Sequence, residues 1–143
     1  MQPGTEFPAQ TYRVTRATLV RYAGASGDFN PIHWNDRQAV AVGLPGVIAH
    51  GMLTMGLAGQ AVACWVGGTA AIVEFSTRFA NPVVVPDDDE GTEIVISGVV
   101  KKVLGEGLVQ IDVAATCQGD KVLGAAKAIV RSDGATPAQP VSM

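Results

Sequence analysis

The sequence contains few charged residues, few cysteines and few histidines. Charged residues make up only 16% of the 143 residues, against 48% hydrophobic residues, which excludes an intrinsically disordered chain. The ten Lys and Arg residues are scattered and the net charge is −3, so neither nucleic acid nor an anionic membrane surface is expected as a partner. So low a charge content indicates that a partner covers part of the surface, and we expect an oligomer.

Several common signatures are also missing. The two cysteines, Cys64 and Cys117, lie far apart without CxxC or Cys/His spacing, so we expect reduced core thiols in a cytoplasmic protein. The N-terminal residues have no basic n-region and no apolar h-region, and no signal peptide is expected. The sequence has no HExxH spacing, no glycine-rich phosphate loop and no nucleophile elbow. We therefore expect no metal and no cofactor.

One long stretch, residues 51–73, carries no charge at all. A membrane-spanning helix needs about 20 predominantly apolar residues and is usually anchored at both ends. This stretch breaks at Gly67-Gly68-Thr69 and lacks such anchors. We therefore predict a helix from Gly51 to about Val66 that is buried by protein, and no membrane span.

The remaining elements fall into a simple order. A strand over residues 10–14 precedes a helix over 15–23, for which Thr15 is the expected N-cap, and a short helix follows over 37–42. After the apolar helix we predict antiparallel strands joined by short turns, over residues 70–80 (continued by 83–85), 92–104, 108–117 and 121–131.

Such a sheet can bury the apolar helix on its concave side, which gives a single α+β domain over residues 1–131. Dimerisation would cover the sheet edges and the free part of the helix. The tail over residues 132–143 is expected to be disordered.

Both histidines lie between Tyr22 and Met55, and one of them follows an isolated acid. Asp28 stands five residues before His33, and Pro31 between them disfavours helical geometry. A carboxylate beside an imidazole is an acid–base pair that works near neutral pH. The alternative is an Asp that caps a turn and a surface His.

Gly51 is the second candidate, because exposed N–H groups at a helix start attract negative charge that develops on a thioester carbonyl. Its alternative role is close packing of the helix against the sheet. His50 is interpreted as a structural hydrogen-bonding residue rather than a second base. Met52 and Met55 are either core residues or the lining of a channel for an alkyl chain.

Residues 22–35, YAGASGDFNPIHWN, resemble the (R)-specific enoyl hydratase signature of the MaoC-like family. AHGM at residues 49–52 resembles the second motif of that family, and RFANPV at 78–83 continues the likeness. The segments GDFNPIHW and IAHGMLTMG most resemble the catalytic B-type subunit of actinobacterial (3R)-hydroxyacyl-acyl-carrier-protein dehydratases.

The resemblance implies a hot-dog fold and reversible syn addition of water to a trans-2-enoyl thioester of coenzyme A or acyl-carrier protein. It implies that Asp28 and His33 form the acid–base pair, that Asn30 holds their segment, and that the Gly51 N–H polarises the thioester carbonyl. It also implies a homodimer, or a heterodimer with a related hot-dog subunit. Two other activities remain open: a non-catalytic or substrate-gripping subunit of a heteromeric complex, and a hot-dog thioesterase.

Overall fold

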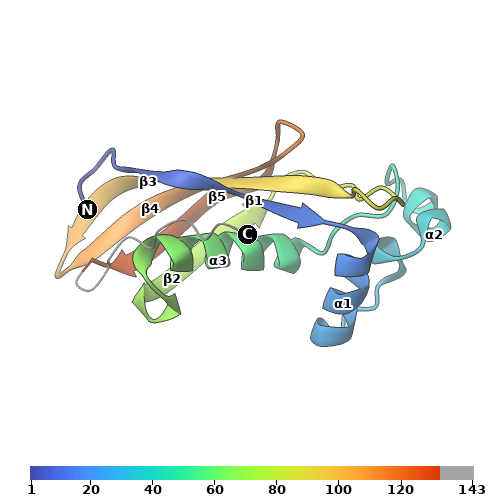
Figure 1. The fold of residues 1–143 in the computed structure, drawn as a ribbon, viewed down its shortest axis with the longest axis horizontal. Helices are drawn as coiled ribbons and strands as arrows, with labels where there is room; N and C mark the ends of the chain where they lie inside the picture. The colour runs from blue at the N-terminus through green and yellow to red at the C-terminus, as the bar shows by residue number, and fades with distance from the viewer. Residues whose placement is uncertain (133–143) are drawn as a thin grey trace.

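The computed structural model describes residues 1–132, which form five strands and three α-helices (Figure 1). The first half of the chain contains the helices: β1 (Glu6–Val14), α1 (Arg16–Ser26), the 3₁₀ turn η1 (Pro31–His33), α2 (Asp36–Ala41) and α3 (Gly51–Val66). The second half contains a 3₁₀ turn and the other strands: η2 (Thr69–Ala71), β2 (Ile72–Phe79), β3 (Thr92–Gly105), β4 (Leu108–Cys117) and β5 (Asp120–Arg131).

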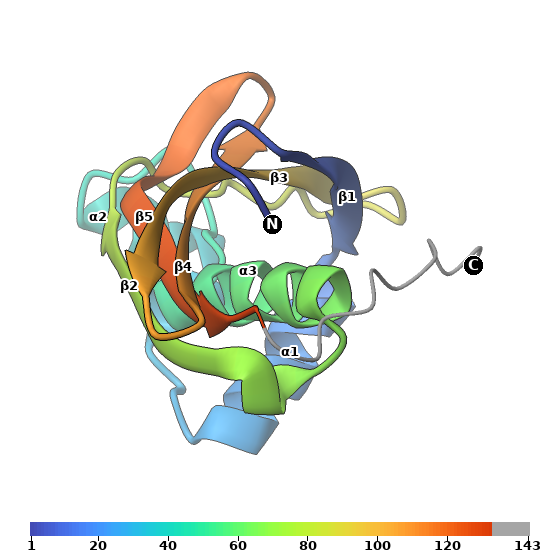
Figure 2. The ribbon, with the colours of Figure 1, turned by 90° about the vertical axis from the view of Figure 1, so that its left-hand side faces the viewer.

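All these strands belong to one antiparallel sheet in the order β1-β3-β4-β5-β2. The sheet curves around α3, which lies along its concave side (Figure 2). Consecutive strands β3, β4 and β5 are joined by short turns, the first of them at Gly105–Glu106–Gly107, where all three residues have positive φ. A single sheet wrapped around one long helix is the hot-dog arrangement, so the predicted α+β fold is confirmed.

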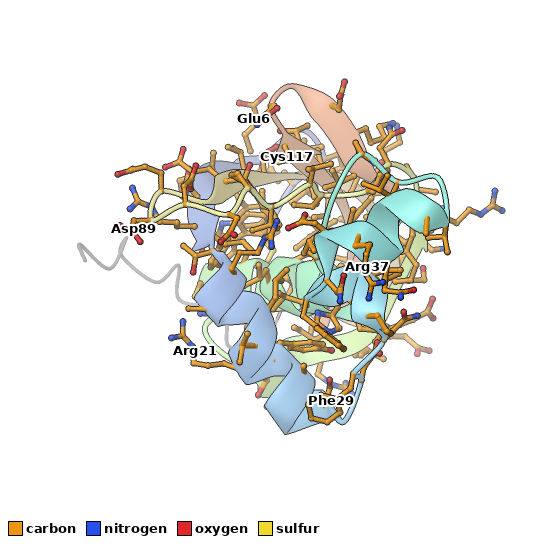
Figure 3. All side chains as sticks on the ribbon, turned by 90° about the vertical axis from the view of Figure 1, so that its right-hand side faces the viewer. Glu6, Arg21, Phe29, Arg37, Asp89 and Cys117 are labelled. Carbon is orange, nitrogen blue, oxygen red and sulfur yellow. The ribbon has the colours of Figure 1, made fainter. Side chains whose placement is uncertain are left out.

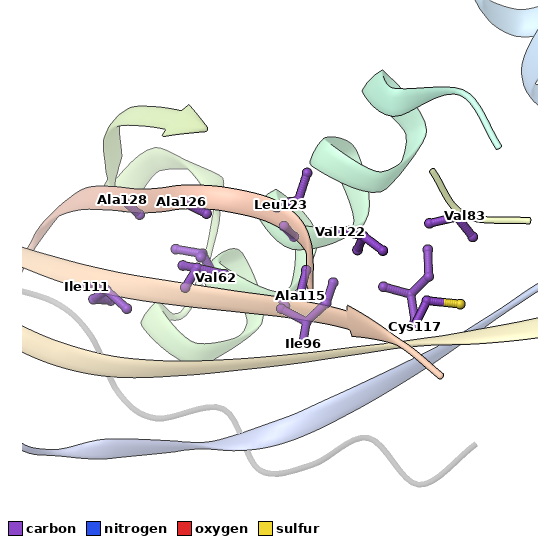
Figure 4. Packing of buried hydrophobic residues seen from close by; sticks show 14 of the residues in the cluster. Val62, Val83, Ile96, Ile111, Ala115, Cys117, Val122, Leu123, Ala126 and Ala128 are labelled. Atoms are coloured by element: carbon purple, nitrogen blue, oxygen red, sulfur yellow. The ribbon is translucent and has the colours of Figure 1, made fainter. Parts of the chain in front are cut away.

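The concave face of the sheet and the near side of α3 form the hydrophobic core (Figure 4). Ala58, Ala61 and Val62 of α3 are fully buried, as are Ile96 of β3 and Ile111 of β4. Small side chains on the helix allow it to lie close to the branched side chains of the sheet. Burying one Val or Ile side chain stabilises the fold by about 1.5–3 kcal/mol, so this seam fixes α3 against the sheet.

Trp65 joins the C-terminal part of α3 to β1. Its ring stacks on Phe7 with 5.1 Å between centroids, and its Nε1–H donates to the Pro8 carbonyl oxygen at 3.0 Å. A bulge in the β1–β3 pairing, between Phe7 and Gln10, lies at this point. The strand therefore begins at Glu6, before the predicted start at residue 10, because Trp65 holds the segment that precedes the bulge.

The segment over residues 83–85 does not continue β2, so that part of the prediction was wrong. Pro82, three residues after the end of β2, has no N–H to donate to a neighbouring strand. The segment instead crosses to the loop before α3, where Val84 forms an isolated antiparallel bridge with Ile48. This bridge holds the backbone that leads to His50.

Two further predictions concern the ends and the membrane. The tail predicted over residues 132–143 lies outside the described residues except for Ser132, whose backbone N–H donates to the Gly107 carbonyl oxygen at 2.7 Å. In residues 1–132, no helix combines the length and the apolar character needed to cross a membrane.

Candidate active site

Overlapping turns after α1 position Asp28 and His33. The helix ends at Gly27, whose φ of 76° is a left-handed conformation that glycine adopts at low cost. The Asp28 side chain accepts a hydrogen bond from the Asn30 N–H at 3.1 Å, and the Asn30 side chain accepts one from the Ile32 N–H at 3.3 Å. The chain therefore bends so that His33 enters the interior, whereas the Asp28 side chain stays half exposed.

The carboxylate of Asp28 and the ring of His33 face each other, with 3.9 Å between Oδ2 and Nε2. This separation is too long for a direct hydrogen bond but suits a small polar molecule bonded to both groups. The other ring nitrogen, Nδ1, lies 2.7 Å from the Ile48 carbonyl oxygen. A carbonyl oxygen only accepts, so Nδ1 carries a proton and Nε2 is left to exchange a proton on the Asp28 side.

His50 lies directly behind this pair. It is 1% exposed, its ring stacks on the His33 ring at 3.8 Å, and its Nε2 lies 3.1 Å from the Asp28 carbonyl oxygen. Burial lowers the pKa of His50 below its ordinary value, and its contact with the Asp28 carbonyl only partly opposes this effect. His50 is therefore a neutral residue at neutral pH.

The N-terminus of α3 lies beside His33. Gly51 is the first residue of the helix, and its N–H has no hydrogen-bond acceptor among residues 1–132. The Phe79 ring covers the Cα side of Gly51, since a Cβ there would lie 3.0 Å from a ring carbon. A ligand carbonyl can therefore reach the helix start only along the side that Phe79 leaves open.

An ion pair holds the loop that precedes α3. The Arg16 guanidinium donates to both carboxylate oxygens of Asp36 at 2.9 and 3.1 Å, and its Nε–H donates to the Val85 carbonyl oxygen at 2.7 Å. Asp36 also accepts the Val47 N–H at 3.1 Å. The Arg16 hydrogen bonds, above all, lower the pKa of Asp36 below its ordinary value. This Arg16–Asp36 ion pair fixes the backbone just before Ile48, and the Ile48 carbonyl oxygen in turn orients the His33 ring.

A cavity of about 270 Å³ connects His33 with the start of α3. Its buried floor includes Thr54, Val122 and Leu123, and its exposed rim is formed by residues 79–82 at the end of β2. Most of this lining is apolar, which suits an acyl chain or a thioester arm better than a charged ligand. A larger open hollow of about 490 Å³ lies over Arg13, Glu90 and neighbouring strands, but it contains no histidine and no helix start.

The sequence of this chain matches the family model of the MaoC like domain over residues 1–118. The chain belongs to the MaoC-like family. The family assignment predicted from the two histidine motifs is thereby confirmed.

Known proteins resemble this MaoC-like chain in sequence or in fold. A solved structure named MaoC-like dehydratase is 39% identical with a TM-score of 0.88, over 92% of this chain and 40% of that one. A curated relative, 3-hydroxyacyl-thioester dehydratase X of Mycobacterium tuberculosis, is 44% identical over 79 residues, which are 55% of this chain and 27% of the relative. The chain therefore spans less than half the length of both. An (R)-hydratase from A. caviae involved in PHA biosynthesis, 22% identical, shares the fold with a TM-score of 0.79, over 92% and 96% of the two chains.

The structure brings together some of the predicted site residues and separates others. Asp28, His33 and His50 lie together, and His33 and Gly51 line the cavity. Met52, in contrast, is 57% exposed, and neither it nor the half-buried Met55 lines that cavity. Residues not singled out from the sequence also line it, namely Thr54, Phe79, Asn81, Val122 and Leu123. Their only sequence signal is the family likeness over residues 78–83, which covers Phe79 and Asn81.

Asp28, His33 and His50 offer ligand atoms within 4.8 Å of one another, so they could in principle hold a metal ion. A metal binds near the plane of each imidazole ligand. The two rings, however, are stacked 3.8 Å apart at an interplanar angle of 23°, and each ring already has one nitrogen beside a backbone carbonyl oxygen, His33 Nδ1 at Ile48 and His50 Nε2 at Asp28. This geometry favours acid–base chemistry over metal binding.

Proposed function

We propose that this domain adds water reversibly to trans-2-enoyl thioesters and gives (3R)-3-hydroxyacyl thioesters. The observation that carries the proposal is the 3.9 Å separation of Asp28 Oδ2 and His33 Nε2, next to the free N-terminus of α3. An acid–base pair and a positive helix end are what the addition of water to an activated double bond requires.

In the proposed reaction, the oxygen of water bonds to C3 while a proton is added to C2. One member of the Asp28–His33 pair takes a proton from the water, and the pair then delivers that same proton to C2, so that both groups return to their starting state. Because Asp28 Oδ2 and His33 Nε2 lie only 3.9 Å apart, both act on one face of the double bond, and the two additions are syn. The Gly51 N–H and the helix dipole stabilise the negative charge that forms on the thioester oxygen in the transition state.

The test is hydration of crotonyl-CoA, and of the matching acyl-carrier-protein thioester, by the purified chain. The variants Asp28→Asn and His33→Ala should each lower kcat/KM by about 10²–10⁴-fold, because each removes one proton-transfer group. Gly24→Ala, at an exposed position of α1, is the matched control and should keep full activity. Hydration that is equal in the wild type and either site variant would contradict the proposal. Release of free thiol would point to a thioesterase instead.

We also propose that the domain works paired with a second hot-dog domain. The outer side of α3 carries no charged residue and exposes Met52, Gly56 and Gln60, and the edge strand β2 exposes Val73. Such an uncharged face beside a free strand edge is typical of a covered interface. The MaoC-like dehydratase and the thioester dehydratase are more than twice as long as their matched parts, which leaves room for a second domain.

The mass of the purified chain, measured by light scattering, tests this assembly. An active homodimer supports the pairing of two copies. An inactive chain that gains activity with a related subunit supports a substrate-gripping or heteromeric arrangement. A monomer with full activity contradicts the pairing.

We propose that the protein is located in the cytoplasm, because of the state of its two cysteines. Neither Cys64 nor Cys117 is in a disulfide, and the Cys117 thiol is buried beside the Thr92 hydroxyl at 3.1 Å. Structural thiols of this kind suit a reducing compartment. Fractionation of the native host, with detection of the chain by antibody, checks the location.

A further inference from the structure

His50 touches both members of the acid–base pair, although its own Nδ1 faces no substrate-sized space. The ring lies flat on His33 at 3.8 Å, and Tyr22 of α1 meets its edge at 4.7 Å. Its Nε2 reaches the Asp28 backbone at 3.1 Å. The side chain is buried and does not line the cavity. It therefore touches the groups of the site without facing the ligand.

The contacts fix the tautomer of this ring. The Asp28 carbonyl oxygen only accepts hydrogen bonds, so the Nε2 of His50 must carry the proton. In the neutral ring, Nδ1 is then an unprotonated acceptor, and this atom is buried without a hydrogen-bond partner among residues 1–132. A proton added there would place a charge in an apolar environment beside His33, at a high cost in free energy. His50 is therefore held as a neutral ring with one donor.

We propose that His50 is the positioning residue of the acid–base pair: its Nε2–H fixes the Asp28 backbone, and its ring face fixes the plane of His33. The proposal rests on the proposed hydratase function. The two contacts come from one rigid ring, so they set the Asp28–His33 separation together. Other hydrogen bonds of the pair, such as that of His33 Nδ1 with the Ile48 carbonyl oxygen and that of the Asn30 N–H with the Asp28 carboxylate, fix each residue alone.

A neutral ring is also the appropriate neighbour for a histidine that gains a proton during the reaction. When His33 carries the proton, the ring stacked on it at 3.8 Å is uncharged and does not repel it. A charged ring at the same distance would repel it strongly, because little solvent lies between them. The titratable side chains that contact or influence His50 are Tyr22 from α1, Asp28 from the loop and His33 from η1.

Two variants separate the contacts. His50→Phe keeps a ring against His33 and removes the donor, and His50→Gln keeps a donor and removes the ring. Each should lower kcat for enoyl-thioester hydration about 10–100-fold with little change in KM, since a displacement of about 1 Å has effects of this size. Both limbs of the pH–rate profile should persist in the variants, because the titrating groups of the pair remain.

Thr92→Val is the matched control, since Thr92 is a buried polar residue that does not line the cavity. It should lower stability without lowering kcat. Full kcat in both His50 variants would overturn the proposal. Loss of one limb of the pH–rate profile would also overturn it, because that result assigns the proton transfer to His50 itself.

A measurement on the wild-type chain keeps the proposal testable if the variants do not fold. Nitrogen-15 NMR of the two histidine rings should show one protonated nitrogen, Nε2, and one bare nitrogen, Nδ1, for His50 across the pH range of activity. A proton on Nδ1, or a doubly protonated ring, would contradict the assigned contacts. This readout needs no activity, so it separates a failure of the positioning role from a failure of the hydratase function.

Discussion

The Phe79 ring lies against Gly51, so close that a single added methyl group on Gly51 would come within 3.0–3.2 Å of three ring carbons. Phe79 ends β2 and Gly51 begins α3, so this contact joins the sheet edge to the helix N-terminus. The ring is nevertheless 57% exposed. The Phe79 side chain therefore lies at the entrance of the cavity, where it can move, and is not part of the core.

Gly51→Ala should therefore affect activity more than stability. The exposed ring can turn away from the new methyl group, so the free energy of unfolding should change by less than about 1 kcal/mol. The displaced ring narrows the approach to the helix N–H groups, and kcat/KM for enoyl-thioester hydration should fall by at least about tenfold. Removing the ring in Gly51→Ala/Phe79→Ala should restore part of the loss.

The matched control is Gly24→Ala in α1, where an added Cβ meets no atom within 4 Å. Alanine should stabilise the helix there by about 0.5–1 kcal/mol without a change in activity. Urea denaturation and initial-rate kinetics on all variants check both quantities. If Gly51→Ala kept the wild-type kcat/KM and its Phe79 ring did not move, this result would show that the contact does not control access to the site.

Gly98→Ala should destabilise the protein more than Gly51→Ala does. A Cβ at Gly98 would lie 2.5 and 2.9 Å from two carbons of the Trp65 ring, which Phe7 and the Pro8 carbonyl hold in place. Overpacking of this kind costs about 1–3 kcal/mol.

The control for this change is Gly24→Ala, in α1, where an added Cβ meets nothing within 4 Å. Urea midpoints of the two variants should differ, with only Gly98→Ala shifted down. Equal midpoints would mean that the Trp65 side chain moves aside for the added methyl group without a loss of stability.

Local patterns predicted most of the fold. The apolar helix begins at Gly51 and ends at Val66, as its uncharged run and the following glycines indicate, and Thr15 caps α1 with its side chain. These features depend on residues close in the chain, so one sequence suffices to find them. The strand prediction failed at residues 83–85, because the partner of that segment, Ile48, lies far away in the chain.

The site divides in the same way. The turns formed by Asp28 and Asn30 are local, and their residue types alone indicate an irregular segment that presents His33. In contrast, the stacking of His50 on His33 and the contact of Phe79 with Gly51 each join segments from different elements. No spacing in the sequence determines such contacts, because they depend on how the sheet curves around α3. Phe29 is exposed and lies at the outer end of the loop that follows α1 (Figure 3).

Asp36→Asn should change the acid stability of the protein. The pKa of Asp36 is lowered in the folded state, so the folded carboxylate stabilises the protein above the ordinary Asp pKa, and this contribution is lost as pH falls through the folded value. The variant keeps an acceptor for the Val47 N–H but loses the charge paired with Arg16. Its free energy of unfolding should therefore fall less steeply in acid than that of the wild type.

The matched control is Asp89→Asn, an exposed acid without a hydrogen bond or ion pair among residues 1–132. Urea denaturation from about pH 2 to about pH 7 compares the three proteins, a range that spans the ordinary Asp pKa. If the unfolding free energy of Asp36→Asn fell as steeply below about pH 4 as that of the wild type, this result would contradict the stabilising role of the Arg16–Asp36 ion pair.

His50 should control the pH dependence of stability at higher pH. Its folded pKa is lowered below the ordinary histidine value, so between these two values the unfolded chain binds more protons than the folded one. Stability should therefore decrease as pH falls from about 6.5 towards the folded pKa of His50. His50→Phe cannot take up this proton. The difference in unfolding free energy between wild type and variant, measured by urea denaturation, should decline through this window and stay level above it. A level difference from about pH 5 to about pH 8 would mean that His50 accepts a proton in the folded protein as readily as in the unfolded chain, against its burial between Tyr22 and His33.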